Sequence, residues 1–174
     1  MRSPTASPER LRFTPRWGTL GLAPEGPILV FATPAQQIWT LSMLLVSGFA
    51  LWRGGRPERW VAVANLIAWI LTPLAYRTDL IDPQWGVFLV DVGFLILLVG
   101  LAVTTDRTWL LFAAAFQLLA VMTHIAIAAD RGVRTLAYFR GLVIWSYLVL
   151  GALAVGAWMF RRAVGAPTRS QGET

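Results

Sequence analysis

The chain has 174 residues, of which 56% are hydrophobic and only 14% charged, and its formal net charge is +6. A water-soluble domain of this length could not bury so much apolar surface, so the composition indicates a membrane protein. The arginines flank apolar runs and do not alternate with exposed aromatic residues, which excludes nucleic-acid binding as the reason for the positive charge. The chain has no cysteine, which excludes disulfides, thiolate metal sites and cysteine nucleophiles.

The two ends of the chain differ in composition from its middle. Residues 1–33 are rich in proline, serine, threonine and arginine without hydrophobic periodicity, and they are predicted to form a flexible polar tail. Their basic residues are not followed by a continuous apolar core, so a cleaved signal peptide is not predicted. Residues 163–174 form a second polar tail. Residues 34–162 are predicted to form a membrane-embedded helical bundle.

Five apolar stretches of about 17 to 25 residues lie between polar loops, which is the length of a membrane helix and about twice that of a barrel strand. We predict spans at residues 34–52, 60–76, 85–103, 108–129 and 136–160. Glutamine, threonine and serine lower the hydrophobicity of the first stretch, so four spans with an interfacial first helix are the alternative. The expected fold is an all-α integral membrane protein.

The loops between these stretches are short. Residues 53–59 (RGGRPER) contain two glycines and a proline, and the whole segment is interpreted as a solvent loop. Residues 104–107 are too few for anything except an antiparallel hairpin. The third and fourth spans are therefore expected to be neighbours.

Tryptophans support the predicted boundaries, because indoles prefer the boundary between lipid and water. Five of them fall at or near span ends, and we expect these to form an interfacial belt: Trp52, Trp60, Trp85, Trp109 and Trp158. Trp39, Trp69 and Trp145 lie deeper in the spans. They are interpreted as packing residues and not as contacts to a ligand.

Three ionisable residues lie inside the predicted spans: Asp91, His124 and Arg140. A charge near the bilayer centre costs at least ~2.5 to 3.5 kcal/mol on insertion scales, so each should face protein, water or a partner. Counting residues from the short loops places the three in one layer near one membrane face, with Gln117 on the same helix face as His124. We expect Asp91 to be ionised and paired with Arg140, and His124 to be neutral beside them.

The polar cluster of Asp91, Gln117, His124 and Arg140 has two interpretations. The first is structural: the four side chains satisfy one another and order the bundle. The second is a proton or ion relay, since Asp and His at membrane depth are the residues that relays use. We favour the structural interpretation, because no further ionisable residues lead to the opposite face.

Small residues recur at helical spacing in two spans. Gly86, Gly93 and Gly100 form a stripe on the third span, and Ala152 and Gly156 form a small-xxx-small pair on the fifth. Such residues let helix backbones approach closely, although chance spacing is the alternative. Asp91 lies about 200° around the helix from Gly93. The third span is therefore predicted to need protein on two opposite faces, either as the central helix or as one that also contacts another chain.

No phosphate loop, nucleophile elbow, paired zinc-binding histidines or dinucleotide fingerprint is present, so we expect no enzyme activity, metal or cofactor. Three functional hypotheses follow. The first is a non-enzymatic accessory, scaffold or assembly module. The second is an oligomeric small transporter or channel that uses Asp91 and His124. The third, less favoured, is a haem- or quinone-associated anchor that uses His124 across a dimer interface.

The arginines also predict a location and a topology. All fifteen basic residues are arginine, a bias that suggests a GC-rich bacterial genome. The loops and tail carrying most arginines near span ends are predicted to face the cytoplasm. This places the N-terminus outside and the C-terminus in the cytoplasm of the inner (plasma) membrane. The expected partners are the lipid bilayer and further copies of the chain or other membrane proteins, and no nucleic acid.

Overall fold

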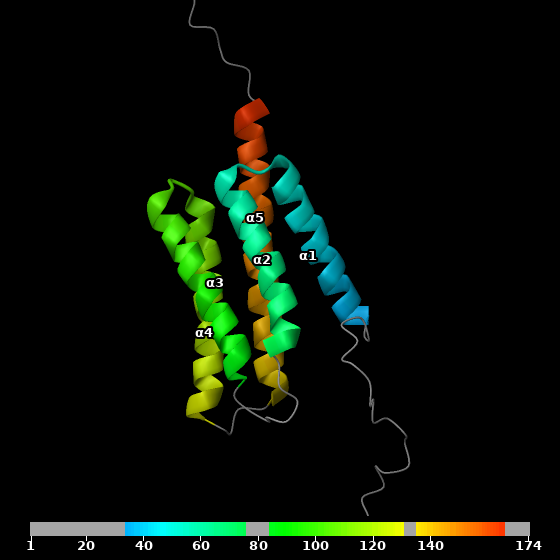
Figure 1. Ribbon diagram of the computed structural model, residues 1–174, viewed down its shortest axis with the longest axis vertical. Coiled ribbons are helices and arrows are strands. Elements are labelled where there is room, and N and C mark those ends of the chain that lie inside the picture. Colours follow the sequence, from blue (N-terminus) through cyan, green and yellow to red (C-terminus); the bar gives the residue numbers. More distant parts are fainter. Residues whose placement is uncertain (1–33, 76–83, 131–134, 166–174) are drawn as a thin grey trace, which may run out of the picture.

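The computed structural model describes residues 34–75, 84–130 and 135–165, which form five α-helices. They are α1 (Pro34–Arg53), α2 (Arg56–Ala75), α3 (Trp85–Thr104), α4 (Thr108–Ala129) and α5 (Thr135–Gly165). Consecutive helices run antiparallel, so α1 begins at one end of the bundle and α5 finishes at the other (Figure 1). We call these the lower and upper ends, as drawn in Figure 1. The predicted N-terminal tail and residues 166–174 lie outside the described residues.

Three of the described helices are long and apolar enough to cross a membrane: α3, α4, and α5 from Ala137 onward. The all-helical part of the prediction is therefore confirmed for the described residues, and three helices have the length and composition of a membrane span. The same measure does not select α1 and α2. A membrane crossing by α1 and α2 therefore depends on which faces of these helices meet lipid.

The five helices form a ring in which each packs against its neighbours in sequence and α5 closes the ring against α1. The most extensive contact is between α4 and α5, and α5 also touches α2. Within the described part of the chain, α3 packs only on α2 and α4. The first of the two alternatives predicted for the third span, a central helix, is therefore wrong, because α2 and α5 each pack on three helices and α3 on two. The second alternative, a contact with another chain, stays a prediction.

The upper half of the bundle is filled by a hydrophobic core. Five of its residues are alanines, whose small side chains allow the helices to approach closely. The core consists of Ala50, Val61, Ala62, Phe94, Leu98, Trp109, Leu110, Ala113, Val149, Ala152, Leu153 and Ala157. The outer surface is also apolar, and Leu45, Leu74, Ile96 and Val103 are each more than 60% exposed. Apolar residues on both the inside and the outside are expected when lipid replaces water as the solvent.

The α1–α2 connection differs from the prediction, because α2 begins at Arg56 and only Gly54 and Gly55 separate the two helices. The interpretation of residues 53–59 as a solvent loop is therefore wrong for its second half. Pro57 suits the first helical turn, and the acidic Glu58 is favourable at that end of the helix dipole. A side chain at position 54 would not fit, since its Cβ would lie 2.4 Å from the carbonyl oxygen of Ala50.

Four of the five tryptophans expected at an interface are exposed near helix ends: Trp52, Trp60, Trp85 and Trp158 are 69%, 62%, 55% and 46% exposed. Trp109 is only 6% exposed and belongs to the core. Its assignment to the interfacial belt is therefore wrong. Position at a helix end does not determine whether a side chain points outward or into the bundle.

The close fit between Gly156 and Trp109 leads to a stability prediction. A Cβ at Gly156 would lie 2.5 Å from two carbons of the indole, whereas one at Gly151, also on α5, would have nothing within 4 Å. We expect Gly156→Ala to destabilise the protein by about 1–3 kcal/mol through overpacking. Gly151→Ala, the matched control, should be neutral or slightly stabilising because alanine favours helix. Thermal unfolding in one detergent compares them, and equal melting temperatures would contradict the fit.

Candidate functional site

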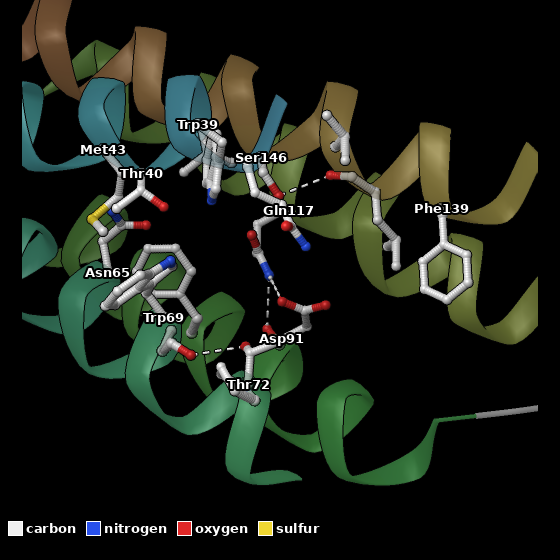
Figure 2. Close-up of a pocket in the computed structure, with 17 residues that line it drawn as sticks. Trp39, Thr40, Met43, Asn65, Trp69, Thr72, Asp91, Gln117, Phe139 and Ser146 are labelled. Carbon is white, nitrogen blue, oxygen red and sulfur yellow. Dashed lines mark hydrogen bonds between the residues drawn. The ribbon is translucent and has the colours of Figure 1, made fainter. Parts of the chain in front are cut away.

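The lower half of the ring contains a cavity of about 310 Å³, and all five helices contribute to its wall (Figure 2). Phe94 and Val149 line the cavity and also belong to the hydrophobic core, which closes the cavity toward the upper end. The wall combines polar and aromatic side chains. These polar and aromatic residues are Gln36, Trp39, Thr40, Asn65, Trp69, Thr72, Asp91, Phe94, Gln117, Phe139 and Ser146.

Two polar residues of α1 are directed inward, the reverse of a helix on a soluble protein. Thr40 and Ser47 are 3% and 0% exposed, while Ile38 and Leu41 on the same helix are 61% and 59% exposed. Ser47 accepts a hydrogen bond from Asn65 of α2 at 3.4 Å. Thr40 and Ser47, which lower the hydrophobicity of the first stretch, therefore face the interior of the bundle, whereas Gln36 and Gln37 in the first turn are exposed.

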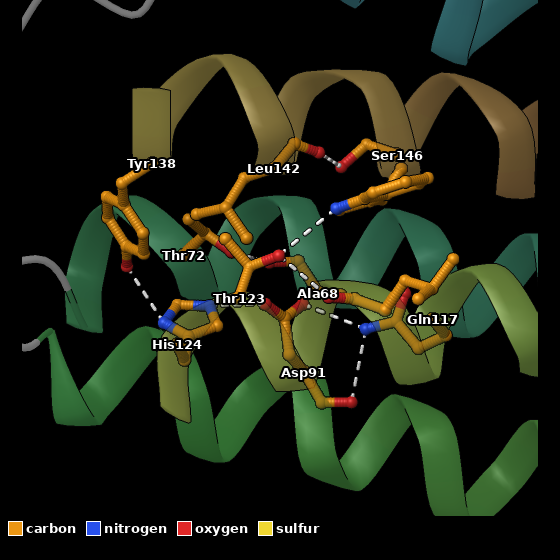
Figure 3. A network of polar contacts seen from close by, with 11 residues as sticks. Ala68, Thr72, Asp91, Gln117, Thr123, His124, Tyr138, Leu142 and Ser146 are labelled. Carbon is orange, nitrogen blue, oxygen red and sulfur yellow. Dashed lines mark hydrogen bonds and ion pairs between the residues drawn. The ribbon is translucent and has the colours of Figure 1, made fainter. Parts of the chain in front are cut away.

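Asp91, in the second turn of α3, extends its carboxylate toward α4 (Figure 3). Its Oδ1 accepts a hydrogen bond from Nε2 of Gln117 at 3.0 Å, and the same nitrogen lies 3.2 Å from the Asp91 carbonyl oxygen. Its Oδ2 lies 2.9 Å from Nε2 of His124. The Asp91 side chain is 24% exposed and the His124 side chain 1%. Asp91 is also one of the residues that line the cavity.

His124 connects Asp91 to a tyrosine on α5. Nδ1 of the ring lies 2.8 Å from the hydroxyl of Tyr138, which is 2% exposed, and Phe88 packs edge-on against the ring at 5.9 Å. A neutral imidazole satisfies both partners by donating one N–H to the carboxylate and accepting the phenol hydrogen on its other nitrogen. The chain Asp91–His124–Tyr138 therefore leads from the cavity wall into the interface between α4 and α5.

The structure brings together three of the four residues of the predicted polar cluster, Asp91, Gln117 and His124. The expected ion pair between Asp91 and Arg140 is not formed: Arg140 is exposed, and the carboxylate meets Gln117 and His124. Counting residues gives a height along the bundle but no direction around a helix. Arg140 follows Tyr138 by two positions and so points about 200° away from it around α5.

The predicted helix-packing residues divide into two groups. Gly86, Ala152 and Gly156 lie at contacts within the chain: a Cβ at Gly86 would lie 2.5 Å from the carbonyl oxygen of Ala75, Ala152 belongs to the core, and Gly156 meets Trp109. Gly93 and Gly100 are exposed, with nothing within 4 Å of the position of a Cβ. The glycine stripe of α3 therefore does not serve one interface inside this chain.

A second buried acidic residue, Glu58, lies at the upper end and was not expected from the sequence. Glu58 is 0% exposed, and its Oε1 accepts a hydrogen bond from Nε1 of Trp109 at 3.1 Å. Its Oε2 has no hydrogen-bond partner among the described residues. The hydrophobic core fills the upper half of the bundle, between Glu58 and the cavity. Glu58 therefore does not extend the Asp91–His124 chain across the membrane.

Thr40 differs from the other hydroxyl-bearing residues of the cavity wall. Its hydroxyl is buried and has no hydrogen-bond partner among the described residues, although it lines the cavity. Thr72 and Ser146, which line the same cavity, instead donate to the carbonyl four residues earlier, at 2.8 Å each. A buried hydroxyl without a partner costs ~1–3 kcal/mol, so a partner inside the cavity would be stabilising.

The arrangement offers little to a haem iron. Both ring nitrogens of His124 lie within hydrogen-bond distance of side chains, and the residue is 2% exposed. An axial ligand needs one free ring nitrogen that faces the iron. Within the described ranges, His, Cys, Asp and Glu side chains do not gather in a group of three that could hold a metal ion. The geometry therefore favours binding through Asp91 over ligation through His124.

No protein-family model, curated protein or solved structure that was compared with the chain matches it. The geometry of the cavity is therefore the main guide to function. Two features matter most, the partly exposed carboxylate of Asp91 and the unpartnered hydroxyl of Thr40.

Proposed function

We propose that this chain is a non-enzymatic membrane protein that takes up a small polar molecule from water into the cavity of its helical ring. One observation carries the proposal: Asp91, whose side chain is 24% exposed, lines a cavity with partly aromatic walls. Ligand sites in proteins are typically concave, mostly apolar, and supplied with a few polar groups. A volume of about 310 Å³ suits a small ligand.

We infer that all five helices cross the membrane. The hydropathy of α1 and α2 is lowered by residues that face the cavity, among them Thr40, Asn65 and Thr72. Their outward residues are apolar, for example Leu45 at 63% and Leu74 at 77% exposure. Lipid meets only the outward faces, so inward polar residues do not prevent a helix from crossing. Each of the two helices has 20 residues, which spans about 30 Å.

The proposed orientation is that of an inner membrane protein in bacteria, with the upper end in the cytoplasm. The upper end carries Arg53, Arg56, Arg59, Arg107, Arg161 and Arg162. Arginines near helix ends are typically more numerous on the cytoplasmic side of a membrane than on the outer side. The cavity then lies in the outer half of the membrane, and the hydrophobic core separates it from the cytoplasm.

Two other functions fit less well. A channel needs a continuous water path, and the core residues Leu98, Leu110 and Leu153, each at most 1% exposed, fill the upper half. A scaffold role is favoured by Gly93, which lies in an apolar groove between α2 and α3. This groove suits a helix of another membrane protein, so a scaffold role is the second candidate.

The proposal predicts that the cavity is reached by water from the outer side only. The chain has no cysteine, so a single cysteine can be introduced without a background. We expect Ser146→Cys to react with a membrane-impermeant methanethiosulfonate reagent added outside intact cells, because Ser146 lines the cavity. Labelling is measured by mass spectrometry of the purified protein.

Ser42→Cys is the matched control. Ser42 also donates to the carbonyl four residues earlier, at 2.8 Å, but it lies outside the cavity wall. We expect it to stay unlabelled in cells and to react after denaturation. If Ser146→Cys is labelled only after the inner membrane is permeabilised, the proposed orientation is reversed. If Ser146→Cys reacts under neither condition, a water-accessible cavity is excluded and with it the proposed function.

A further inference from the structure

We propose that the molecule bound in the cavity is a small protonated amine. This inference rests on the proposed function, since it specifies the ligand of the same cavity. It follows from the charge of the site, from the kind of hydrogen-bonding positions left free, and from the aromatic wall.

The charge of the cavity wall favours a cation. Among the described residues that line the cavity, Asp91 is the only charged one. Its partners in the structure are the neutral amide of Gln117 and the imidazole of His124, while Arg140 is exposed. An ionised carboxylate beside a neutral imidazole leaves one negative charge in the membrane interior without compensation, which is costly. A cation bound beside Asp91 would supply the compensating charge.

The acceptor positions of Asp91 that remain free favour a hydrogen-bond donor. A carboxylate offers about four acceptor positions. In the structure Gln117 and His124 each take one, and the Asp91 side chain is 24% exposed and lines the cavity. A ligand group at this point must therefore be a donor. An ammonium group has three donors and no acceptor, and it supplies the missing positive charge.

The walls of the cavity are partly aromatic. Trp39 and Trp69 reach toward the cavity from α1 and α2 (Figure 2). Phe94 and Phe139 line it from α3 and α5. Aromatic faces attract cations and also accept an apolar tail. The buried hydroxyl of Thr40 provides one further polar contact, which suits an amine with a second polar group.

The test uses the full-length wild-type protein in lipid nanodiscs and isothermal titration calorimetry. The probes are butylammonium and 1-butanol, which share the apolar chain and differ in charge. We expect butylammonium to bind about ten- to a hundredfold more tightly, the usual effect of a charge-assisted hydrogen bond. Equal affinities would overturn the amine assignment.

A second measurement uses Ser146→Cys. Butylammonium should slow the labelling of the introduced cysteine, and the same concentration of 1-butanol should not. Adding Asp91→Asn should abolish the protection, provided that its melting temperature shows a folded protein; if it does not fold, the two wild-type titrations decide. Labelling without protection by the amine would reject this inference and leave the proposed function standing. Absence of labelling rejects both.

Discussion

Glu58→Ala is expected to lower the free energy of unfolding by about 3–5 kcal/mol, the largest effect of a single substitution at the upper end. The change removes the acceptor of the Trp109 N–H and leaves a cavity where a side chain with 0% exposure stood. Two penalties therefore add, one for the unsatisfied indole and one for the lost packing. Unfolding by heat or by denaturing detergent, followed by circular dichroism, measures the loss.

Glu58→Gln and Trp109→Phe separate these two contributions. The glutamine amide has the shape of the carboxyl group and keeps an oxygen for Trp109, so we expect a loss below about 1.5 kcal/mol. Trp109→Phe removes the donor and leaves both oxygens of Glu58 without a partner in a buried position, so its loss should be nearer to that of Glu58→Ala. If Glu58→Ala is no less stable than Glu58→Gln, the buried hydrogen bond does not stabilise the bundle.

Glu58 also shows what the sequence cannot provide. The pattern around it, RGGRPER, is rich in turn-forming and charged residues and is typical of a solvent loop. The helices themselves were predictable, because long apolar stretches specify helices wherever lipid is the solvent. The direction of one side chain in the first turn of a helix depends on the neighbours packed around it. Here those neighbours are Trp109, Phe160 and the two glycines of the connection, which are distant in sequence or unusually small.

The candidate site was predictable where a tight connection fixes the register of two helices. Only Thr105, Asp106 and Arg107 separate α3 from α4, so counting from this turn correctly placed Asp91 near Gln117 and His124. The partner on α5 was not predictable, since residues 131–134 connect α4 to α5 and height alone does not distinguish Tyr138 from Arg140. The cavity was not foreseen either. In the sequence, Thr40 only lowers the hydrophobicity of its helix, and Trp39 and Trp69 are interpreted as packing residues.

The structure replaces the expected Asp91–Arg140 pair with the Asp91–His124 pair, and a double-mutant cycle distinguishes them. His124→Leu removes a ring that holds both Asp91 and Tyr138, so Oδ2 of Asp91 and the hydroxyl of Tyr138 each lose a buried hydrogen bond. We expect a loss of about 2–5 kcal/mol, because buried polar groups without partners carry their full desolvation penalty. Arg140→Ala should change stability by less than about 0.5 kcal/mol, as is usual for exposed residues.

Combination with Asp91→Leu then decides which contact exists. Residues in contact typically show a coupling energy of about 0.5–3 kcal/mol, whereas residues without a shared partner add within about 0.5 kcal/mol. Asp91→Leu with His124→Leu should therefore lose less stability than the sum of the single variants, since each change removes the group that the other leaves unsatisfied. Asp91→Leu with Arg140→Ala should be additive. The reverse pattern, coupling to Arg140 and additivity with His124, would place the arginine beside the carboxylate. The site would then already hold its compensating cation, and an amine would have no charge left to neutralise.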